Sequence, residues 1–203
     1  MQQKEFENKN NFYYFSLAII IIARLVLNAV IPLMDKTEAR YAEIARIMAE
    51  TGNWITPQID YGIPFWAKPP LSTWLSALSI NIFGVNEFAV RFPSFVISIL
   101  LLLLLKPFAK RSNIPLVIPA FILFTVPEFL IHVGVVSTDM TLLLTMTLMM
   151  IAFWESMNDG KLIWKYVFFA AMGLGFLAKG PIVLVLTLPP ILVWAFWFKE
   201  LKK

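Results

Sequence analysis

The sequence predicts an all-α integral membrane protein with about six transmembrane helices. Three observations support this prediction: an apolar composition, a series of apolar segments, and one long polar segment after the first of them. The 203-residue chain is 59% hydrophobic and 15% charged, with a mean hydropathy of +0.75. Soluble domains average about 45–50% apolar and about 25% charged residues. The chain therefore lacks the polar surface that a soluble domain of this size requires.

Six apolar segments approach the length of about 20 helical residues that crosses a bilayer core. In chain order they are Phe12–Pro32, Glu87–Leu105, Ile114–Val133, Met140–Trp154, Trp164–Ala178 and Ile182–Phe198. The first is too long for a signal-peptide core, carries Arg24 in its middle and precedes no small-residue cleavage site. We therefore interpret residues 12–32 as the first transmembrane helix and residues 87–198 as the remaining spans.

The Lys and Arg residues indicate how these segments cross the membrane. With a cytoplasmic N-terminus, the inner segments are basic, whereas the outer segments beyond residues 33–86 are almost free of basic residues. The positive-inside rule thus favours two cytoplasmic termini and a periplasmic first loop. We expect a multi-pass protein of the bacterial inner membrane. Since this distribution accounts for the net charge of +4, no nucleic-acid partner is indicated.

The polar segment 33–86 begins with an amphipathic helix. Thr37 is a suitable N-cap residue, and apolar residues then recur at i, i+3, i+4 and i+7 from Tyr41 to Met48. Gly52 provides a stop signal. We expect this helix to lie on the membrane surface or against the helical bundle.

The second half of the segment predicts a loop followed by another helix. Residues 56–70 contain several prolines and a glycine, which exclude a helix and indicate an ordered loop. Residues 71–83 are apolar with interleaved Ser and Thr, and Gly84 follows them. We predict a second interfacial helix over this stretch.

Several motifs along the chain resemble those of one enzyme family. "TEARYAEIARIMAETGNWITP" is followed in order by "PFWAKPPLSTW", "FAVRFPS", "STDMTL" and "GLGFLAKGP". Together these stretches resemble the bacterial GT-C glycosyltransferases of the protein O-mannosyltransferase-like family, which includes the 4-amino-4-deoxy-L-arabinose lipid A transferase. The similarity runs from about residue 33 to residue 190.

This resemblance implies a fold and a reaction. Family members are membrane enzymes that transfer a sugar, with inversion, from a polyprenyl-phosphate carrier to lipid A, a glycan or a protein hydroxyl. The implied partners are therefore the polyprenyl-phosphate sugar, its acceptor and membrane lipids. Family members are also longer. We therefore expect residues 1–203 to form one transmembrane module, the N-terminal portion of that architecture, with the C-terminal part absent or supplied by a partner chain.

The resemblance also implies catalytic carboxylates, because an inverting transfer needs a base for the acceptor proton. The family base is an Asp directly before the Glu of the E-x-R-Y run. Thr37 occupies that position here, so we predict Asp35 as the base and Glu38 as the alternative. Asp139 is predicted as a second carboxylate, either a partner of the base or a cation ligand. Asp35 would otherwise mark the end of the first span, and Asp139 would otherwise cap a helix.

Four residues match positions that contact the carrier phosphate in the family: Arg40, Tyr41, Lys68 and Lys179. Guanidinium and ammonium groups suit phosphate oxygens, whereas Tyr41 equally fits an apolar contact in its helix. Ala67 stands where the arabinose transferases often carry an acidic metal ligand. No cofactor is therefore assigned, and a divalent cation remains an open alternative.

His132 is not part of any of these motifs. One histidine does not form a metal site by itself, and we interpret His132 as an interfacial histidine near the end of the third span. Arg24 and Glu128 are ionisable residues within predicted spans. A charged side chain there costs free energy, and such residues are often functional. A rival reading of the whole chain is a truncated, non-catalytic membrane subunit that binds polyprenyl-phosphate lipid.

Overall fold

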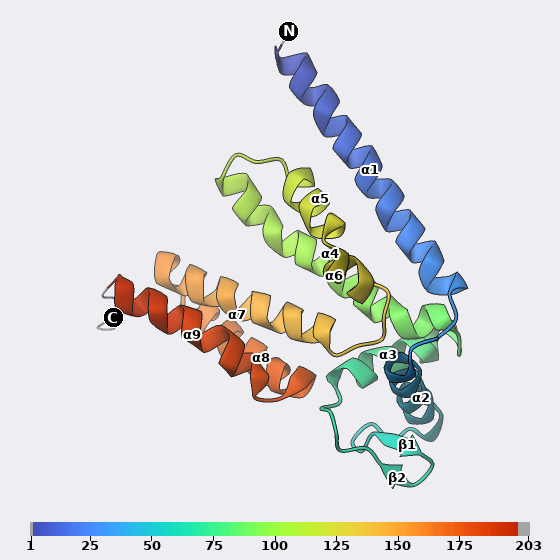
Figure 1. Ribbon diagram of the computed structural model, residues 1–203. Coiled ribbons are helices and arrows are strands. Elements are labelled where there is room, and N and C mark those ends of the chain that lie inside the picture. The colour runs from blue at the N-terminus through green and yellow to red at the C-terminus, as the bar shows by residue number, and fades with distance from the viewer. Residues whose placement is uncertain (1, 199–203) are drawn as a thin grey trace.

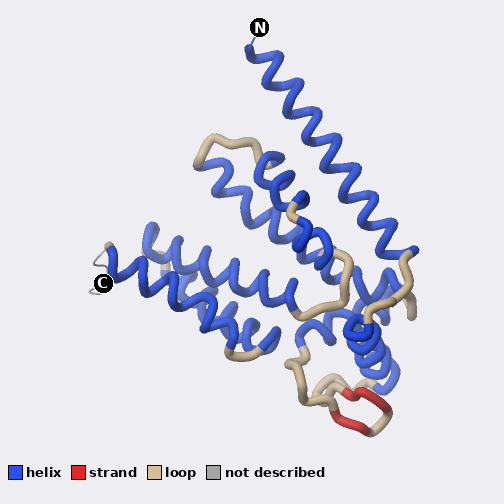
Figure 2. The backbone as a smooth tube through the Cα atoms, in the orientation of Figure 1, coloured by secondary structure: helices blue, strands red, loops and turns tan. Residues whose placement is uncertain are grey.

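The computed structural model describes residues 2–198, with side chains described from residue 11 onward. It is mostly helical, with one small two-stranded sheet (Figures 1 and 2). In chain order the elements are α1 (Gln2–Val30), α2 (Lys36–Thr51), β1 (Gln58–Asp60), β2 (Ile63–Pro64), α3 (Leu71–Phe83), α4 (Glu87–Arg111), α5 (Val117–Thr125), α6 (Pro127–His132), α7 (Asp139–Asp159), α8 (Leu162–Lys179) and α9 (Ile182–Trp197). The predicted all-α membrane fold is confirmed.

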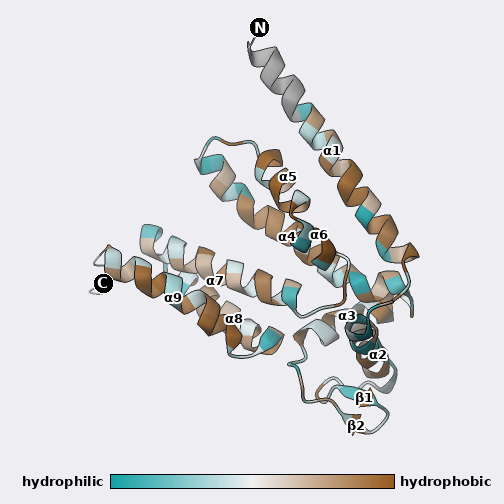
Figure 3. Cartoon of the chain, viewed as in Figure 1, coloured by the Kyte–Doolittle hydropathy of each residue, from teal (hydrophilic) through white to brown (hydrophobic). Residues whose placement is uncertain are grey.

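Within the described part of the chain, four helices are long and apolar enough to cross a membrane. They are α4, α7, α8 and the stretch Asn11–Val30 of α1. These helices are largely brown in the hydropathy colouring of Figure 3, with teal residues at the ends of α7 and α8 that lie nearest α3. They correspond to four of the six predicted spans. The sixth predicted span is α9, an apolar helix of 16 residues.

The third predicted span, Ile114–Val133, is not a single helix. It is divided into α5 and α6, which meet at Val126 and Pro127. Val126 has an extended backbone with φ −71° and ψ 116°, a conformation that a following proline favours. Pro127 also has no N–H with which to continue the α5 ladder. The prediction of one continuous helix was therefore wrong at this point, and the break gives α6 its own direction.

The polar segment between α1 and α4 is built on α2 and α3. The N-cap of α2 is Asp35 and not the predicted Thr37, because the Asp35 side chain accepts the backbone N–H groups of Thr37 and Glu38. The predicted stop at Gly52 is confirmed, with a left-handed φ of 68° that glycine tolerates best. The helix over Leu71–Phe83 has the predicted bounds and ends at Gly84.

The predicted ordered loop contains a short antiparallel hairpin, β1 and β2 (Figure 2). A hydrogen-bonded cluster of side chains fastens this hairpin to α2. The Tyr61 hydroxyl donates to Glu50 Oε2 at 2.7 Å, and Arg46 Nη1 donates to the same oxygen at 2.5 Å. The cluster fixes the position of a segment that has little apolar core of its own.

The helices converge toward α2 and α3. In Figure 1 the ends of α1, α4 and α7 that lie nearest α2 and α3 come together, whereas their opposite ends spread apart. The helix α3 packs against both α2 and α4 and also contacts α8. A small buried cluster joins these elements, with Ala45 and Met48 of α2 against Ala77 of α3 and Ala89 of α4. The predicted site residues lie around this junction.

Candidate active site

The clearest ionic contact of the predicted site joins Asp139 to Lys179. Asp139 is the first residue of α7, and Lys179 is the last residue of α8. Lys179 Nζ donates a hydrogen bond to Asp139 Oδ1. The two helices form an antiparallel pair joined by a short turn, which brings residues 40 positions apart in sequence into contact.

His132 approaches the same carboxylate from α6. Its Nε2 lies 3.6 Å from Asp139 Oδ2, and its Nδ1 lies 2.9 Å from the main-chain oxygen of Glu128. The Glu128 carboxylate is also near, with Oε1 at 3.4 Å from Nδ1. All three side chains line one cavity of about 370 Å³, whose other walls are apolar. His132 belongs to none of the sequence motifs. Only the fold brings its side chain close to Asp139.

A second centre is the buried ion pair between Glu38 of α2 and Arg91 of α4. Arg91 Nε donates to Glu38 Oε1 at 2.8 Å, and Arg91 Nη2 donates to Glu38 Oε2 at 3.0 Å. The two side chains are only 4% and 3% exposed. Since both carboxylate oxygens already accept from the guanidinium, this geometry favours Asp35 over the alternative Glu38 as the base.

The same ion pair also gathers the surrounding backbone. Arg91 donates to the carbonyl oxygens of Asn28, Ile31 and Pro32, at the end of α1 and just beyond it. Glu38 Oε1 accepts the backbone N–H of Val136 at 3.2 Å. The pair therefore fixes the segment that leads to Asp35 on one side and the segment that leads to Asp139 on the other. In the sequence, Arg91 is recognisable only as part of the motif "FAVRFPS".

Asp35 is exposed and carries the N-cap of α2. Its Oδ1 accepts from the backbone N–H of Thr37 at 2.8 Å and of Glu38 at 3.0 Å. These contacts, first from Glu38 and then from Thr37, lower the pKa of the Asp35 carboxyl below its usual value. The carboxylate is thus ionised at neutral pH, as a base must be. It lines a cavity of about 230 Å³ together with Arg24 and Asn28 of α1.

Arg40 and Tyr41 lie on α2. Tyr41 is half-buried, and its ring packs edge-on against Phe65 with 6.2 Å between the centroids. Burial raises the pKa of the Tyr41 hydroxyl; the charge of Arg40 opposes this shift and the charge of Asp139 adds to it. Both charges therefore act on the Tyr41 hydroxyl, although no hydrogen bond joins the three side chains within the described residues.

Lys68 and Arg40 are exposed. Neither side chain forms an ion pair or a hydrogen bond with another residue in the part of the chain that the structure describes. The structure thus pairs Lys179 with Asp139 and leaves these two predicted phosphate ligands facing outward. It does not bring Lys68 into contact with the other predicted residues.

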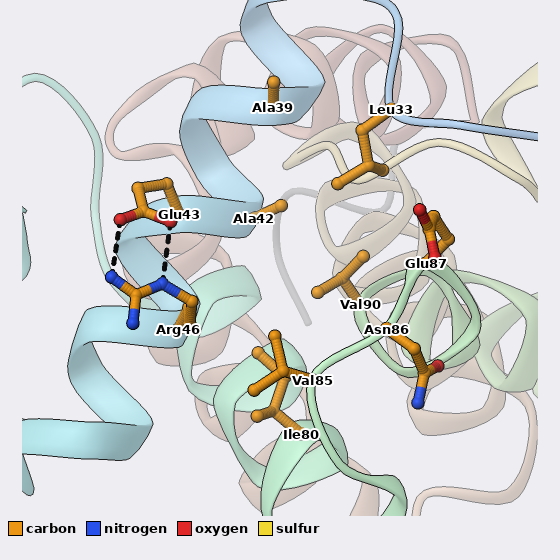
Figure 4. A pocket seen from close by; sticks show the side chains of 10 residues that line it. All are labelled: Leu33, Ala39, Ala42, Glu43, Arg46, Ile80, Val85, Asn86, Glu87 and Val90. Atoms are coloured by element: carbon orange, nitrogen blue, oxygen red, sulfur yellow. Dashed lines mark hydrogen bonds and ion pairs between the residues drawn. The ribbon is translucent and has the colours of Figure 1, made fainter.

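A separate cavity of about 230 Å³ lies between α2 and the turn from α3 to α4 (Figure 4). Its walls include Ala39 and Ala42 of α2 and Val90 of α4, and the Glu43–Arg46 ion pair stands at its edge. None of the predicted site residues lines this cavity. This cavity is therefore not part of the candidate active site.

The described residues offer no set of three or more His, Cys, Asp or Glu side chains arranged to hold a metal ion. Asp139 lies beside two basic neighbours, Lys179 and His132. The arrangement combines the ion pair at the ends of α7 and α8 with an ionised Asp35 and with the exposed basic side chains of Arg40 on α2 and Lys68 in the loop after β2. Such a group of charges suits a phosphate-bearing substrate and a proton transfer.

Sequence comparison identifies the family of the chain. Residues 11–203 match the dolichyl-phosphate-mannose-protein mannosyltransferase family. An undecaprenyl phosphate-alpha-4-amino-4-deoxy-L-arabinose arabinosyl transferase from Wigglesworthia glossinidia brevipalpis is 32% identical over 204 residues, which cover 95% of this chain and 36% of the relative. The protein of the same name from Edwardsiella ictaluri (strain 93-146) is 33% identical over 196 residues, which cover 89% and 34%.

Structural comparison points to the same group. The crystal structure of ArnT from Cupriavidus metallidurans in the apo state is similar with a TM-score of 0.78 at 20% identity, over 93% of this chain and 36% of that one. The form bound to undecaprenyl phosphate gives a TM-score of 0.77 at 21% identity, over 94% and 36%. The fold is thus shared, and the chain spans about a third of the length of these relatives. Because the family match covers nearly the whole sequence, this chain belongs to the dolichyl-phosphate-mannose-protein mannosyltransferase family.

Proposed function

We propose that this chain is a transmembrane catalytic module of an inverting glycosyltransferase that takes a sugar from a polyprenyl-phosphate carrier. The observation that carries the proposal is the Asp139–Lys179 pair with His132 beside it, at the ends of helices that meet near α2. Family membership supports it, and the relatives named above are described as transferases that use undecaprenyl phosphate. The acceptor is lipid A, a glycan or a protein hydroxyl.

In the proposed reaction Asp35 removes the acceptor proton. As the acceptor oxygen forms a bond to the anomeric carbon, the bond from that carbon to the carrier phosphate breaks on the opposite face. The products are the inverted glycoside, polyprenyl phosphate and a protonated Asp35. The lowered pKa of Asp35 keeps its carboxylate ionised and ready to accept this proton.

Basic side chains stabilise the charge that develops on the leaving phosphate. Lys179 and the exposed Arg40 and Lys68 are the proposed contributors. Because Lys179 is already paired with Asp139, a bound phosphate competes with that carboxylate for the ammonium group. Asp139 thus holds Lys179 in place until the carrier arrives.

The site is proposed to face the periplasm, with both termini in the cytoplasm, in the bacterial inner membrane. The chain contains no cysteine, so a single Asn53→Cys substitution creates one labelling site in the segment between α2 and β1. We expect a membrane-impermeant maleimide to label Asn53→Cys in cells whose outer membrane is permeable. Labelling only after the inner membrane is opened would reverse the proposed orientation.

Transfer of sugar from a polyprenyl-phosphate donor by purified protein is the direct test of function. We expect wild type to transfer sugar and Asp35→Asn to lose most of that activity. Equal turnover by both proteins would contradict the assignment of the base. A full-length relative serves as the positive control for the donor and acceptor.

A second function is a non-catalytic subunit that binds or handles polyprenyl-phosphate lipid. One observation favours it: Ala67 stands where the arabinose transferases often carry an acidic residue. It predicts saturable binding of polyprenyl phosphate without transfer. Binding with no turnover, under conditions in which the full-length relative is active, would select this alternative.

A further inference from the structure

The Nε2 atom of His132 is the best-placed group that the proposed reaction does not use. His132 is the last residue of α6 and the single histidine of the sequence. Its Nδ1 lies 2.9 Å from the main-chain oxygen of Glu128, one turn earlier in the helix. A carbonyl oxygen only accepts hydrogen bonds, so Nδ1 carries a proton. Nε2 is therefore the ring atom that gains or loses the second proton.

This atom faces a carboxylate that is already bound on its other side. Nε2 lies 3.6 Å from Asp139 Oδ2, and Asp139 Oδ1 accepts from Lys179 Nζ. Asp139 therefore stands between two basic groups, one at the end of α6 and one at the end of α8. The two groups approach different oxygens of this one carboxylate.

We propose that His132 is a positioning residue that holds Asp139 in its orientation toward Lys179. The proposal rests on the proposed function, in which Asp139 belongs to the active site. A protonated Nε2 attracts Asp139 Oδ2 across 3.6 Å, beyond the length of a hydrogen bond, while Lys179 binds Oδ1. The carboxylate is thus approached from both sides.

Charged groups from several helices surround the imidazole. Glu128 of α6 places Oε1 at 3.4 Å from Nδ1, but its side chain is 80% exposed and so is screened by solvent. Lys179 of α8 lies beyond Asp139 of α7. Arg24 of α1 donates to the main-chain oxygen of Ile131 at 3.0 Å. Asp139 is the less exposed of the two carboxylates near the ring, at 43%, and we assign it the larger influence.

Two amide substitutions separate the role of each ring nitrogen. The amide nitrogen of Gln reaches about as far as Nε2 of His, whereas that of Asn reaches only about as far as Nδ1. His132→Gln keeps a donor toward Asp139, and His132→Asn keeps only the contact with the Glu128 carbonyl. We expect kcat/KM of the Gln variant to exceed that of the Asn variant about tenfold, the effect of one charge-assisted hydrogen bond.

Rescue of activity by the Gln variant, relative to the Asn variant, is a readout that general destabilisation does not reproduce. Equal kcat/KM for the Gln and Asn variants would overturn the positioning role.

A spectroscopic test works without any transfer activity. The full chain, labelled with ¹⁵N-histidine and placed in lipid nanodiscs, gives a single set of ring signals because the sequence has one histidine. We expect the neutral ring to carry its proton on Nδ1, and Asp139→Asn to shift the Nε2 signal far more than Glu128→Gln does. A neutral ring protonated on Nε2, or equal shifts in both variants, would refute the proposal. Failure of wild type to transfer sugar would contradict the proposed function and leave this test intact.

Discussion

Arg91 donates two parallel hydrogen bonds to Glu38, a residue 53 positions earlier in the sequence. Neither side chain is more than 4% exposed to solvent. The pair connects the long helix α4 to the outer helix α2. Through Val136 and the carbonyl oxygens beyond α1, it also holds both segments that carry the proposed catalytic carboxylates. Its energetic and functional consequences are testable.

Removal of one member of this pair is expected to be strongly destabilising. Arg91→Leu leaves the Glu38 charge buried without a partner, a situation that costs about 3–5 kcal/mol in free energy of unfolding. The double variant Glu38→Leu, Arg91→Leu removes both charges and is expected to regain part of that loss. Thermal unfolding in detergent measures both. A double variant less stable than Arg91→Leu would contradict this expectation and show that Glu38 stabilises the fold without Arg91.

Asp35 is expected to have two separable roles, as helix cap and as base. Asn is also a good N-cap residue, so Asp35→Asn keeps the cap of α2, whereas Asp35→Ala loses it. Both variants are expected to lose about 10²–10⁴-fold in kcat, the usual contribution of a general base. Asp35→Ala is expected to have the lower thermal unfolding temperature of the two variants. Similar stability of the two variants would argue against the cap seen in the structure.

The lowered pKa of Asp35 also predicts a dependence of stability on pH. Because the folded-state pKa lies below the unfolded value of about 3.9, the carboxylate stabilises the fold above that value. This stabilisation is expected to disappear as the pH falls through the folded-state pKa. Unfolding temperatures of wild type and Asp35→Asn, measured from neutral to acid pH, are expected to converge at the acid end.

Gly134 is expected to accept no larger residue, because it makes room for Arg24. A Cβ atom at this position would lie 1.7 Å from Arg24 Nη2. Gly134→Ala should therefore displace the guanidinium from the Ile131 carbonyl and cost about 1–3 kcal/mol, as overpacking commonly does. The variant Arg24→Ala, Gly134→Ala is expected to be less affected than the sum of the two single changes. Strict additivity of the unfolding free energies would contradict this contact.

Two glycines of α8 provide a matched pair. A Cβ at Gly175 would lie 2.6 Å from Val183 Cγ2, whereas a Cβ at Gly173 would meet nothing within 4 Å. Gly175→Ala is expected to destabilise the contact of α8 with α9 by about 1–3 kcal/mol. Gly173→Ala is expected to be neutral, or to stabilise the helix by up to about 1 kcal/mol. Unfolding temperatures of the two variants measured side by side test the prediction.

The sequence predicted those parts of the fold that depend on local signals. Apolar length located the helices that cross the membrane, and Gly52 and Gly84 ended α2 and α3 where predicted. The error at the third span had a local signal as well, since Pro127 stands inside it. The apolar composition of residues 114–133 nevertheless led to the prediction of one continuous helix. The N-cap was assigned to Thr37 because Thr and Asp are both suitable caps, and the end of α1 decides which of them is used.

The site was less predictable, because its decisive contacts join distant positions. The resemblance located Asp139 and Lys179, but their ion pair follows from the turn between α7 and α8. Arg91 and His132 gave no local sign of their partners. The approach of His132 to Asp139 depends on the break at Pro127, which gives α6 its own direction. The catalytic and phosphate-binding roles assigned here remain predictions.

The shortness of α9, and the division of the third apolar segment into α5 and α6, bear on the surrounding bilayer. A helix of 16 residues such as α9 is about 24 Å long at a rise of about 1.5 Å per residue. A hydrocarbon core of about 30 Å exceeds this length, and lipids next to such a segment compress to match it. The membrane is therefore expected to be thinnest next to α9. There, lipid headgroups from the outer leaflet would sink toward the level of Asp139 and Lys179.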